Sequence, residues 1–302
     1  MWVWPGSIRA FGWEPIVTRI ERLRPLAVGG IIILVAVGCA ALAPLLAPHD
    51  PYAQAVGLRL IPPVWDAGGG WTNILGTDPL GRDLLSRIIY GAQISISAGA
   101  LAVSVSMVLG VLMGLLAGYY GGSVDTVISN AVNLMLAFPF LLLALAAVAV
   151  IGPGFRNMVI VLGVTGWPIY TRVVRAETLK YREREFVLAA RALGLGSPRI
   201  IWGHVLPNLV NTIIVMASLE VARMIILESF LSFLGLGIQP PTPSWGAMLG
   251  EGRVYVFTHW WLATFPGLAI FVTTLGINLF GDGLRDLLDP HRSLSAATAR
   301  TE

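Results

Sequence analysis

The stretch YREREFVLAARALGLGSPRIIWGHVLP, residues 181–207, is a polar segment in a chain that is 56% hydrophobic and only 12% charged. Arginines stand at positions 182, 184, 191 and 199, and long apolar segments lie on both sides, at residues 158–174 and 209–236. Soluble domains have about 25% charged residues. The flanking segments are therefore predicted to span a membrane, and residues 181–207 to connect them in water.

Six segments of the chain are long and apolar enough to cross a bilayer. A hydrocarbon core about 30 Å thick needs about 20 apolar residues per helix. Because backbone groups in lipid must be paired within helices or closed barrels, the predicted fold is all-α, a polytopic membrane protein with six transmembrane helices. The predicted spans are residues 26–47, 94–118, 127–151, 158–174, 209–236 and 261–280.

The distribution of basic residues predicts the orientation of these spans. With the N-terminus inside, the cytoplasmic segments hold fourteen Lys and Arg residues and the external segments five. Cytoplasmic loops carry such an excess, so both termini and residues 181–207 are predicted to be cytoplasmic. The first span, 26–47, is preceded by a cytoplasmic segment 1–25 and followed by an external loop 48–93. It is longer than the apolar core of a cleavable signal, about 7 to 15 residues.

Several function classes are excluded by single residue types. Lys180 is the only lysine and follows leucine, so the Gly-Lys-Ser/Thr of a phosphate-binding loop cannot occur. Cys39 is the only cysteine and the four histidines are far apart, so no metal site or cofactor is expected. The arginines form no stripe that could follow nucleic acid. We expect no enzymatic activity, and any ATP hydrolysis must come from a partner.

Small residues recur at every fourth position of the second span. In lipid, such a face lets two helix backbones approach closely. A buried helix contact is favoured, with a substrate-lining face as the alternative. The residues are Ala98, Ala102, Ser106, Gly110, Gly114 and Gly118.

Prolines interrupt two other spans. Pro139 predicts a kink in the third span. Pro168, after Trp167 in the fourth span, either breaks the helix beside a transport pathway or bends it for packing.

The fifth span carries three charges, at Glu220, Arg223 and Glu228. An isolated charge in the bilayer centre costs about 2.5 to 3.5 kcal/mol, so these side chains must face protein or water. Glu220 and Arg223 are three residues apart and can pair on one helix face. They either form a structural ion pair or line a translocation pathway.

The external segments contain a charged motif and a proline-rich loop. In LGTDPLGRDLLSR, residues 75–87, Asp78 or Asp83 is predicted to cap a turn that leads into a helix. Trp260 and Trp261 follow the proline-rich loop and are predicted interfacial anchors.

Residues 183–195 of the polar segment are predicted to form a helix, because their apolar residues fall near one side. Gly194 or Gly196 should end it, and Pro198 can begin a second short helix. From these residues alone, the segment is either a docking element for a partner or an interfacial connector.

The pattern LAARALG at 188–194, followed after nine residues by HVLP at 204–207, resembles the EAA loop of permease subunits of bacterial ABC importers. In that family the loop forms a coupling helix, here between the fourth and fifth spans, that inserts into a groove of the ATPase. The resemblance implies coupling roles for Leu188, Ala189, Ala190, Gly194, Leu206 and Pro207. Leu188 stands where the family pattern has glutamate, and His204 where it has isoleucine.

Further segments resemble the C-type permease of dipeptide, oligopeptide and nickel importers. They are residues 75–87, 118–122, 228–241 and 244–246. The resemblance implies a permease core at 94–282 with five spans and a coupling loop at 175–207, followed by a cytoplasmic tail at 283–302. The implied substrate is a di- or oligopeptide, with nickel or another small solute as the alternative.

The same resemblance implies a multi-pass protein of the bacterial inner membrane that forms half of a translocation pathway. The implied partners are a homologous second permease in a heterodimer, two ATP-binding cassette subunits and an extracytoplasmic solute-binding protein. A stand-alone secondary carrier is the rival hypothesis, because Glu220 and Glu228 could bind a coupling ion.

Overall fold

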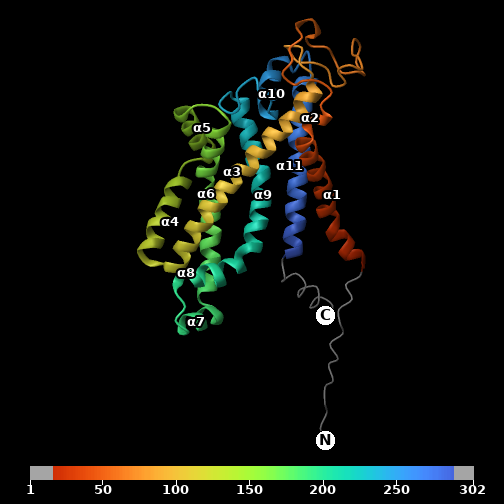
Figure 1. Ribbon diagram of the computed structural model, residues 1–302. Coiled ribbons are helices and arrows are strands. Elements are labelled where there is room, and N and C mark those ends of the chain that lie inside the picture. Colours follow the sequence, from red (N-terminus) through yellow and green to blue (C-terminus); the bar gives the residue numbers. More distant parts are fainter. Residues whose placement is uncertain (1–15, 289–302) are drawn as a thin grey trace.

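The computed structural model describes residues 16–288, which fold into helices joined by turns (Figure 1). Within this range there is no β-strand, and one isolated bridge pairs Thr77 with Asp83. The all-α prediction is confirmed. The outer parts of the predicted terminal segments, residues 1–15 and 289–302, lie outside the described residues.

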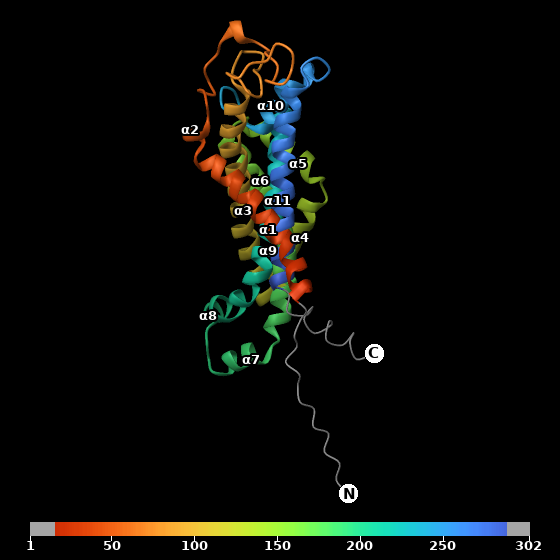
Figure 2. The same cartoon turned by 90° about the vertical axis from the view of Figure 1, so that its right-hand side faces the viewer.

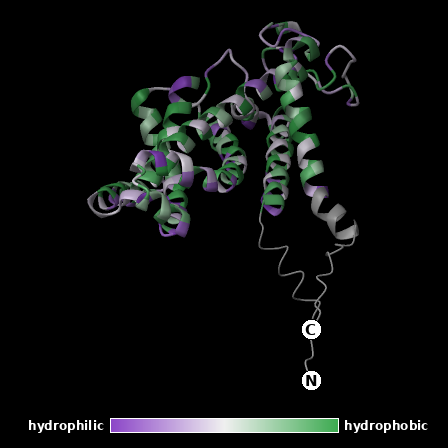
Figure 3. Cartoon of the chain, turned by 60° about the horizontal axis from the view of Figure 1, so that its bottom comes forward, coloured by the Kyte–Doolittle hydropathy of each residue, from purple (hydrophilic) through white to green (hydrophobic). Residues whose placement is uncertain are grey.

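Five helical segments are long and apolar enough to cross a membrane. Figure 3 shows hydrophobic residues along most of the helical surface. The polytopic prediction is thereby confirmed. The segments are α1 (Ile16–Ala41), α3 (Leu84–Tyr120), α6 (Phe155–Arg182), the continuous stretch Ser197–Phe233 that ends in α9 (Leu206–Phe233), and α11 (Trp261–Leu288).

The predicted third span is not one kinked helix. It is divided into α4 (Gly122–Leu136) and α5 (Phe140–Ile151), which are bent by 87°. Pro139 has no N–H to continue the helix, and its ring disfavours helical geometry at Phe138. The two helices count as a sixth span only if the bent pair is taken together.

The helices form an elongated bundle with two distinct ends. At one end lie α7 (Glu185–Ala192) and α8 (Ser197–Ile200), together with the beginning of α1 and the end of α11 (Figures 1 and 2). The opposite end carries α2 (Ala43–Leu46) and the loop 48–83 that follows it, which contains a short 3-10 turn η1 (Val56–Leu58). The helix α10 (Trp245–Gly252) lies at the same end. We refer to these as the α7 end and the α10 end.

The small-residue face of α3 packs against α6 and α9, and its residues are buried. A methyl group added at Gly114 would lie 2.7 Å from Val174 Cβ, and one added at Gly118 would lie 2.6 Å from Thr178 Cβ. Ser106 Oγ donates to the carbonyl of Gly163 at 2.8 Å. The buried helix contact is therefore what this face forms, as predicted.

The fourth span is longer than predicted and unbroken. Pro168 is buried inside α6, so the alternative of a broken helix there is wrong. The helix also continues through Lys180 and Arg182, which the sequence pattern assigned to the connecting loop. Basic residues in a last helical turn are stabilised by the helix dipole, and this favours the extension.

The helix α10 lies in the proline-rich segment that was predicted to be a loop. Ser244 caps α10 by accepting from Ala247 N at 3.2 Å, and the short turn η3 (Arg253–Tyr255) follows. Trp261 is only 5% exposed, and its Nε1 donates to Thr77 O at 3.4 Å. The prediction of an interfacial anchor is thus wrong for Trp261, which joins the 48–83 loop to α11.

Candidate coupling segment and intramembrane charges

The helix α7 is attached to the bundle by one narrow apolar face. Val187 is fully buried and Ala190 is 5% exposed, and both pack in a cluster with residues of α3, α6 and α9. The predicted helix at 183–195 is shorter, because Glu183 caps the end of α6 and α7 runs from Glu185 to Ala192. The first turn of α7 therefore follows directly from the end of a membrane-spanning helix.

Gly194 ends this segment in a defined geometry. Its φ is +78°, a left-handed conformation that glycine adopts without a steric penalty. Gly194 N donates to Arg191 O at 2.9 Å and Leu195 N to Ala190 O at 3.1 Å. These two bonds form a Schellman motif, which satisfies the last carbonyls of the helix. Of the two glycines proposed to end the helix, Gly194 is therefore the one that does so.

The opposite face of α7 is exposed and partly apolar. Leu188 is 50% exposed, Leu193 is 80% exposed and Ala189 is also exposed. A methyl group at Gly194 would meet nothing within 4 Å. The predicted coupling residues therefore divide into two groups, since Leu188, Ala189 and Gly194 face outward while Ala190 packs inward.

The second half of the loop leads into α9. Pro198 lies in the first turn of α8, as predicted, and a π-helical turn η2 (Ile201–Val205) follows. Leu206 is partly buried against the same cluster as Val187, whereas Pro207 is exposed in the first turn of α9, where its missing N–H is tolerated. The Leu206-Pro207 pair thus marks the helix start and lies apart from the exposed face of α7.

Two arginines connect the loop to the end of α3, and sequence reasoning missed both contacts. Arg191 Nε donates to Tyr119 Oη at 3.3 Å, and Arg182 Nη1 donates to Gly118 O at 3.3 Å. The Gly118-Tyr119 motif was the available signal. A contact between residues about 70 positions apart depends, however, on how α3 and α6 pack.

Glu220 and Arg223 form the predicted ion pair. Arg223 Nη1 donates to Glu220 Oε2 at 3.0 Å, and the Arg223 guanidinium lies 4.7 Å from the centre of the Phe140 ring of α5. The Arg223 side chain is 35% exposed and that of Glu220 is 16% exposed, so the pair is accessible from the surface. The pair links α9 to α5 beside the break at Pro139.

Glu228 lies in a different environment and makes no ion pair among the described residues. Its side chain is fully buried and accepts from Ser232 Oγ at 2.8 Å and from Ser229 Oγ at 3.2 Å. The hydroxyls supply the hydrogen bonds that a buried carboxyl group needs. The structure therefore does not join Glu228 to the Glu220–Arg223 pair.

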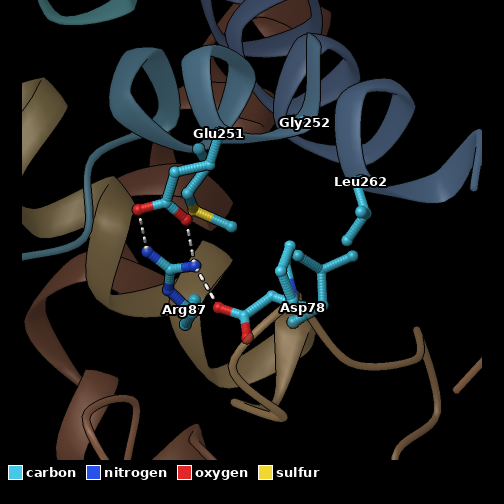
Figure 4. Close-up of a pocket in the computed structure, with 8 residues that line it drawn as sticks. Asp78, Arg87, Glu251, Gly252 and Leu262 are labelled. Carbon is cyan, nitrogen blue, oxygen red and sulfur yellow. Dashed lines mark hydrogen bonds and ion pairs between the residues drawn. The ribbon is translucent and has the colours of Figure 1, made fainter. Parts of the chain in front are cut away.

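The 75–87 motif forms both the predicted cap and a buried ion cluster. Asp83 accepts from Ser86 N at 2.9 Å and caps α3. Figure 4 shows Arg87 between Asp78 and Glu251, with its Nη1 2.5 Å from Asp78 Oδ2 and 2.7 Å from Glu251 Oε2. Sequence reasoning missed Glu251, which is 164 positions from Arg87 and comes from α10.

A polar hollow of about 290 Å³ lies between α4 and α6. Arg175 Nη2 donates to Asp125 Oδ2 at 2.6 Å, and Arg172 Nη2 donates to Asn133 Oδ1 at 3.2 Å. The sequence shows the two arginines three residues apart, but the hollow depends on the position of α4. Elsewhere too, residues 16–288 present no group of three His, Cys, Asp or Glu side chains that could hold a metal ion.

Two models of known protein families match separate parts of the chain. A family model described as the binding-protein-dependent transport system inner membrane component matches residues 110–294. A second, described as the N-terminal transmembrane domain of oligopeptide transport permease C, matches residues 22–63.

Curated relatives cover nearly the full length. The di/tripeptide transport system permease protein DppC of Pseudomonas aeruginosa is 46% identical over 289 residues, which are 95% of this chain and 93% of the relative. The dipeptide permease DppC of Haemophilus influenzae is 41% identical, covering 89% of this chain and 92% of the relative. The glutathione permease GsiD of Pectobacterium atrosepticum is 40% identical, covering 92% and 91%.

A solved structure supports the fold independently. The inward-facing MetNI methionine ABC transporter contains a chain with a TM-score of 0.54 and 16% identity, covering 67% of this chain and 96% of that one. At this identity the likeness concerns the fold alone. The family matches and the relatives identify a permease component of an ABC importer rather than its ATPase. The chain belongs to the family of binding-protein-dependent transport system inner membrane components, and it is a multi-pass protein of the bacterial inner membrane.

Proposed function

We propose that this chain forms half of the translocation pathway of an ATP-driven importer for di- or oligopeptides. The observation that carries the proposal is the sequence identity to permeases named for di/tripeptide and dipeptide transport. The identities are 46% and 41%, and the matches cover most of each chain. The alternative of nickel or another small solute has no comparable support in the structure. The rival of a stand-alone carrier is weakened because Glu228 is buried among serine hydroxyls rather than exposed to a pathway.

The proposed partners are a homologous second permease, two ATP-binding cassette subunits and an extracytoplasmic solute-binding protein. Support for a second permease comes from Arg172 and Arg223, which lie on spanning helices and are accessible from the surface of the chain. A charged side chain there must be covered by protein or water rather than lipid. A second permease that encloses a water-filled pathway would supply that cover.

Coupling is proposed to occur at the exposed face of α7, at Leu188, Ala189 and Gly194. The ATPase would contact this face in the cytoplasm, which requires the α7 end and both termini to be cytoplasmic. Ala190, together with Val187, would transmit the displacement, because it packs in one cluster with α3, α6 and α9. Leu206 and Pro207 would carry the motion into α9, and the Glu220–Arg223 pair would line the pathway farther along that helix.

The test is uptake of radiolabelled dialanine by vesicles that contain the complete importer and its binding protein. We expect uptake to require internal ATP and to be unaffected when proton and sodium gradients are collapsed. Importer with a catalytically inactive ATPase subunit is the matched control. Uptake driven by an ion gradient without ATP would contradict the proposal, as would ATP-driven uptake of nickel but not of dialanine.

A further inference from the structure

The hollow between α4 and α6 has the size and lining of a small-molecule site. Its volume of about 290 Å³ lies at the lower end of the range of about 300 to 1,000 Å³ that ligand pockets occupy. Polar side chains make up most of the lining. The residues are Ser129, Val132, Asn133, Thr171, Arg172 and Arg175.

The charges in the hollow do not cancel. Arg175 forms two hydrogen bonds with Asp125, which also accepts from Ser129 Oγ at 3.0 Å. Arg172 makes one hydrogen bond, to the neutral amide oxygen of Asn133, and no ion pair with a carboxylate of the described residues. A guanidinium has five N–H donors. Arg172 therefore leaves one net positive charge in the hollow and several donors that make no hydrogen bond to the described residues.

The position of Arg172 along α6 bears on what its charge can contact. It lies ten residues before Arg182, the last residue of α6, which is about 15 Å along a helix with a rise of 1.5 Å per residue. Arg172 is also two residues from the end of the predicted span 158–174, so it lies near the cytoplasmic side, where the charge of an arginine must be covered by protein, lipid headgroups or water. Beside a second permease, this exposed side chain would face the water-filled pathway.

We propose that Arg172 binds the C-terminal carboxylate of a peptide during its passage, an inference that rests on the proposed function. The planar guanidinium fork matches a carboxylate with two parallel hydrogen bonds. The neighbouring Arg175–Asp125 pair is already satisfied, so it shapes the hollow without competing for the ligand. The protonated amino group of the same peptide is repelled by Arg172, and this orients the peptide with its carboxyl end in the hollow.

The test measures the charge preference of the hollow directly. Cys39 is the only cysteine, so Cys39→Ser with Ser129→Cys places a single thiol of this chain in the lining that Ser129 shares with Arg172. Assembled importer in vesicles is treated with an anionic sulfonate or a cationic trimethylammonium methanethiosulfonate. The rate at which each reagent modifies the thiol is divided by its rate with a small free thiol, which removes differences in intrinsic reactivity. The background measured with importer that has Cys39→Ser but keeps Ser129 is subtracted. We expect the anionic reagent to be favoured about tenfold, since one charge attracts it and repels the other.

Variants of Arg172 separate binding from structure. Arg172→Gln should remove the preference, whereas Arg172→Lys should keep it because the charge remains. Arg156→Gln is the control, since Arg156 is an exposed arginine near the other end of the same helix and should leave the preference unchanged. Gel filtration and thermal unfolding establish that each importer is assembled. An unchanged preference in assembled Arg172→Gln importer would overturn the proposal.

Protection by ligand identifies the occupant. Dialanine should slow modification of Ser129→Cys, and its C-terminal amide should not. Equal protection by both compounds would overturn the carboxylate assignment. Protection that requires phosphatidylglycerol in the vesicles and is insensitive to dialanine would overturn it too, because a lipid phosphate would then be the occupant.

Failure of this inference can be told from failure of the proposed function. If unsubstituted importer lacks ATP-driven dialanine uptake, the proposed function is wrong and the carboxylate assignment is withdrawn with it. If uptake is normal and protection does not depend on Arg172, only the present inference is overturned.

Discussion

Arg191 of α7 lies over the ring of Tyr119, with its Cζ 4.9 Å from the ring centre and its Nε donating to Tyr119 Oη at 3.3 Å. The two residues are 72 positions apart and join α7 to the last turn of α3. Because α3 packs along α6 and α9, a displacement of α7 would reach three spanning helices through this contact and the neighbouring apolar cluster.

Removing the Tyr119 ring should weaken coupling more than removing its hydroxyl. A cation–π contact at a partly exposed site contributes about 0.5 to 1 kcal/mol, which corresponds to about a two- to fivefold effect. Tyr119→Ala is expected to lower dialanine uptake per ATP hydrolysed by about that factor, and Tyr119→Phe to lower it less. Uptake and ATP hydrolysis are measured in the same vesicles. Equal ratios in Tyr119→Ala and unsubstituted importer would refute a role in coupling.

A charge at Gly194 should abolish transport without unfolding the chain. Asp and Asn both tolerate left-handed backbone conformations, so neither should prevent the turn at φ +78° from forming. Among the described residues, nothing lies within 4 Å of an added methyl group, so a strong defect would point to a contact with a partner. Gly194→Asp is expected to reduce uptake and stimulation of the ATPase more than tenfold.

Gly194→Asn is the matched control because it has nearly the same shape without the charge, and a smaller loss is expected. Uptake and ATPase rates of both variants are compared at equal levels of assembled importer. Normal ATP-coupled uptake with Gly194→Asp would remove Gly194 from the proposed contact.

The ion cluster at the α10 end should be sensitive to the loss of a single member. Arg87 is 2% exposed and bonds to both Asp78 and Glu251. Arg82 pairs with the same two carboxylates, so without Arg87 two negative charges share one guanidinium. Breaking a buried ion pair completely costs about 3 to 5 kcal/mol, and the partial loss here should cost less than that. Arg87→Ala should therefore lower the thermal unfolding temperature of purified importer by several degrees. Arg59→Ala, at an exposed site of the same loop, should leave the temperature unchanged.

Local features were predictable from the sequence, and features set by distant packing were not. The small-residue face of α3 and the helix end at Gly194 depend on nearby residues and are found as predicted. The contact of Arg87 with Glu251 depends on how α10 returns to α3, which no local pattern encodes. Pro139 was recognised as a helix-disrupting residue. The extent of the bend, 87°, is set by the packing of α4 and α5 on α6.

The contact between Gly99 and Ile225 provides the sharpest test of how α3 and α9 pack. A methyl group at Gly99 would lie 2.7 Å from Ile225 Cγ1, whereas its nearest backbone atoms would be 3.4 Å away. Gly99→Ala should destabilise the chain by about 1 to 3 kcal/mol through overpacking. Ile225 is fully buried, so Ile225→Ala should cost about 2 to 5 kcal/mol by leaving a cavity.

The double variant should lose less free energy of unfolding than the two single variants lose together, because the added methyl group then enters the space left by Ile225. Such coupling between contacting residues is typically about 0.5 to 3 kcal/mol. Chemical unfolding of the purified chain in detergent gives the three free energies of unfolding. Gly38→Ala is the control, since a methyl group there meets nothing within 4 Å and should not destabilise the chain. Strict additivity of the Gly99 and Ile225 effects would show that α3 and α9 do not make this contact, and the bundle would need a different packing at that level.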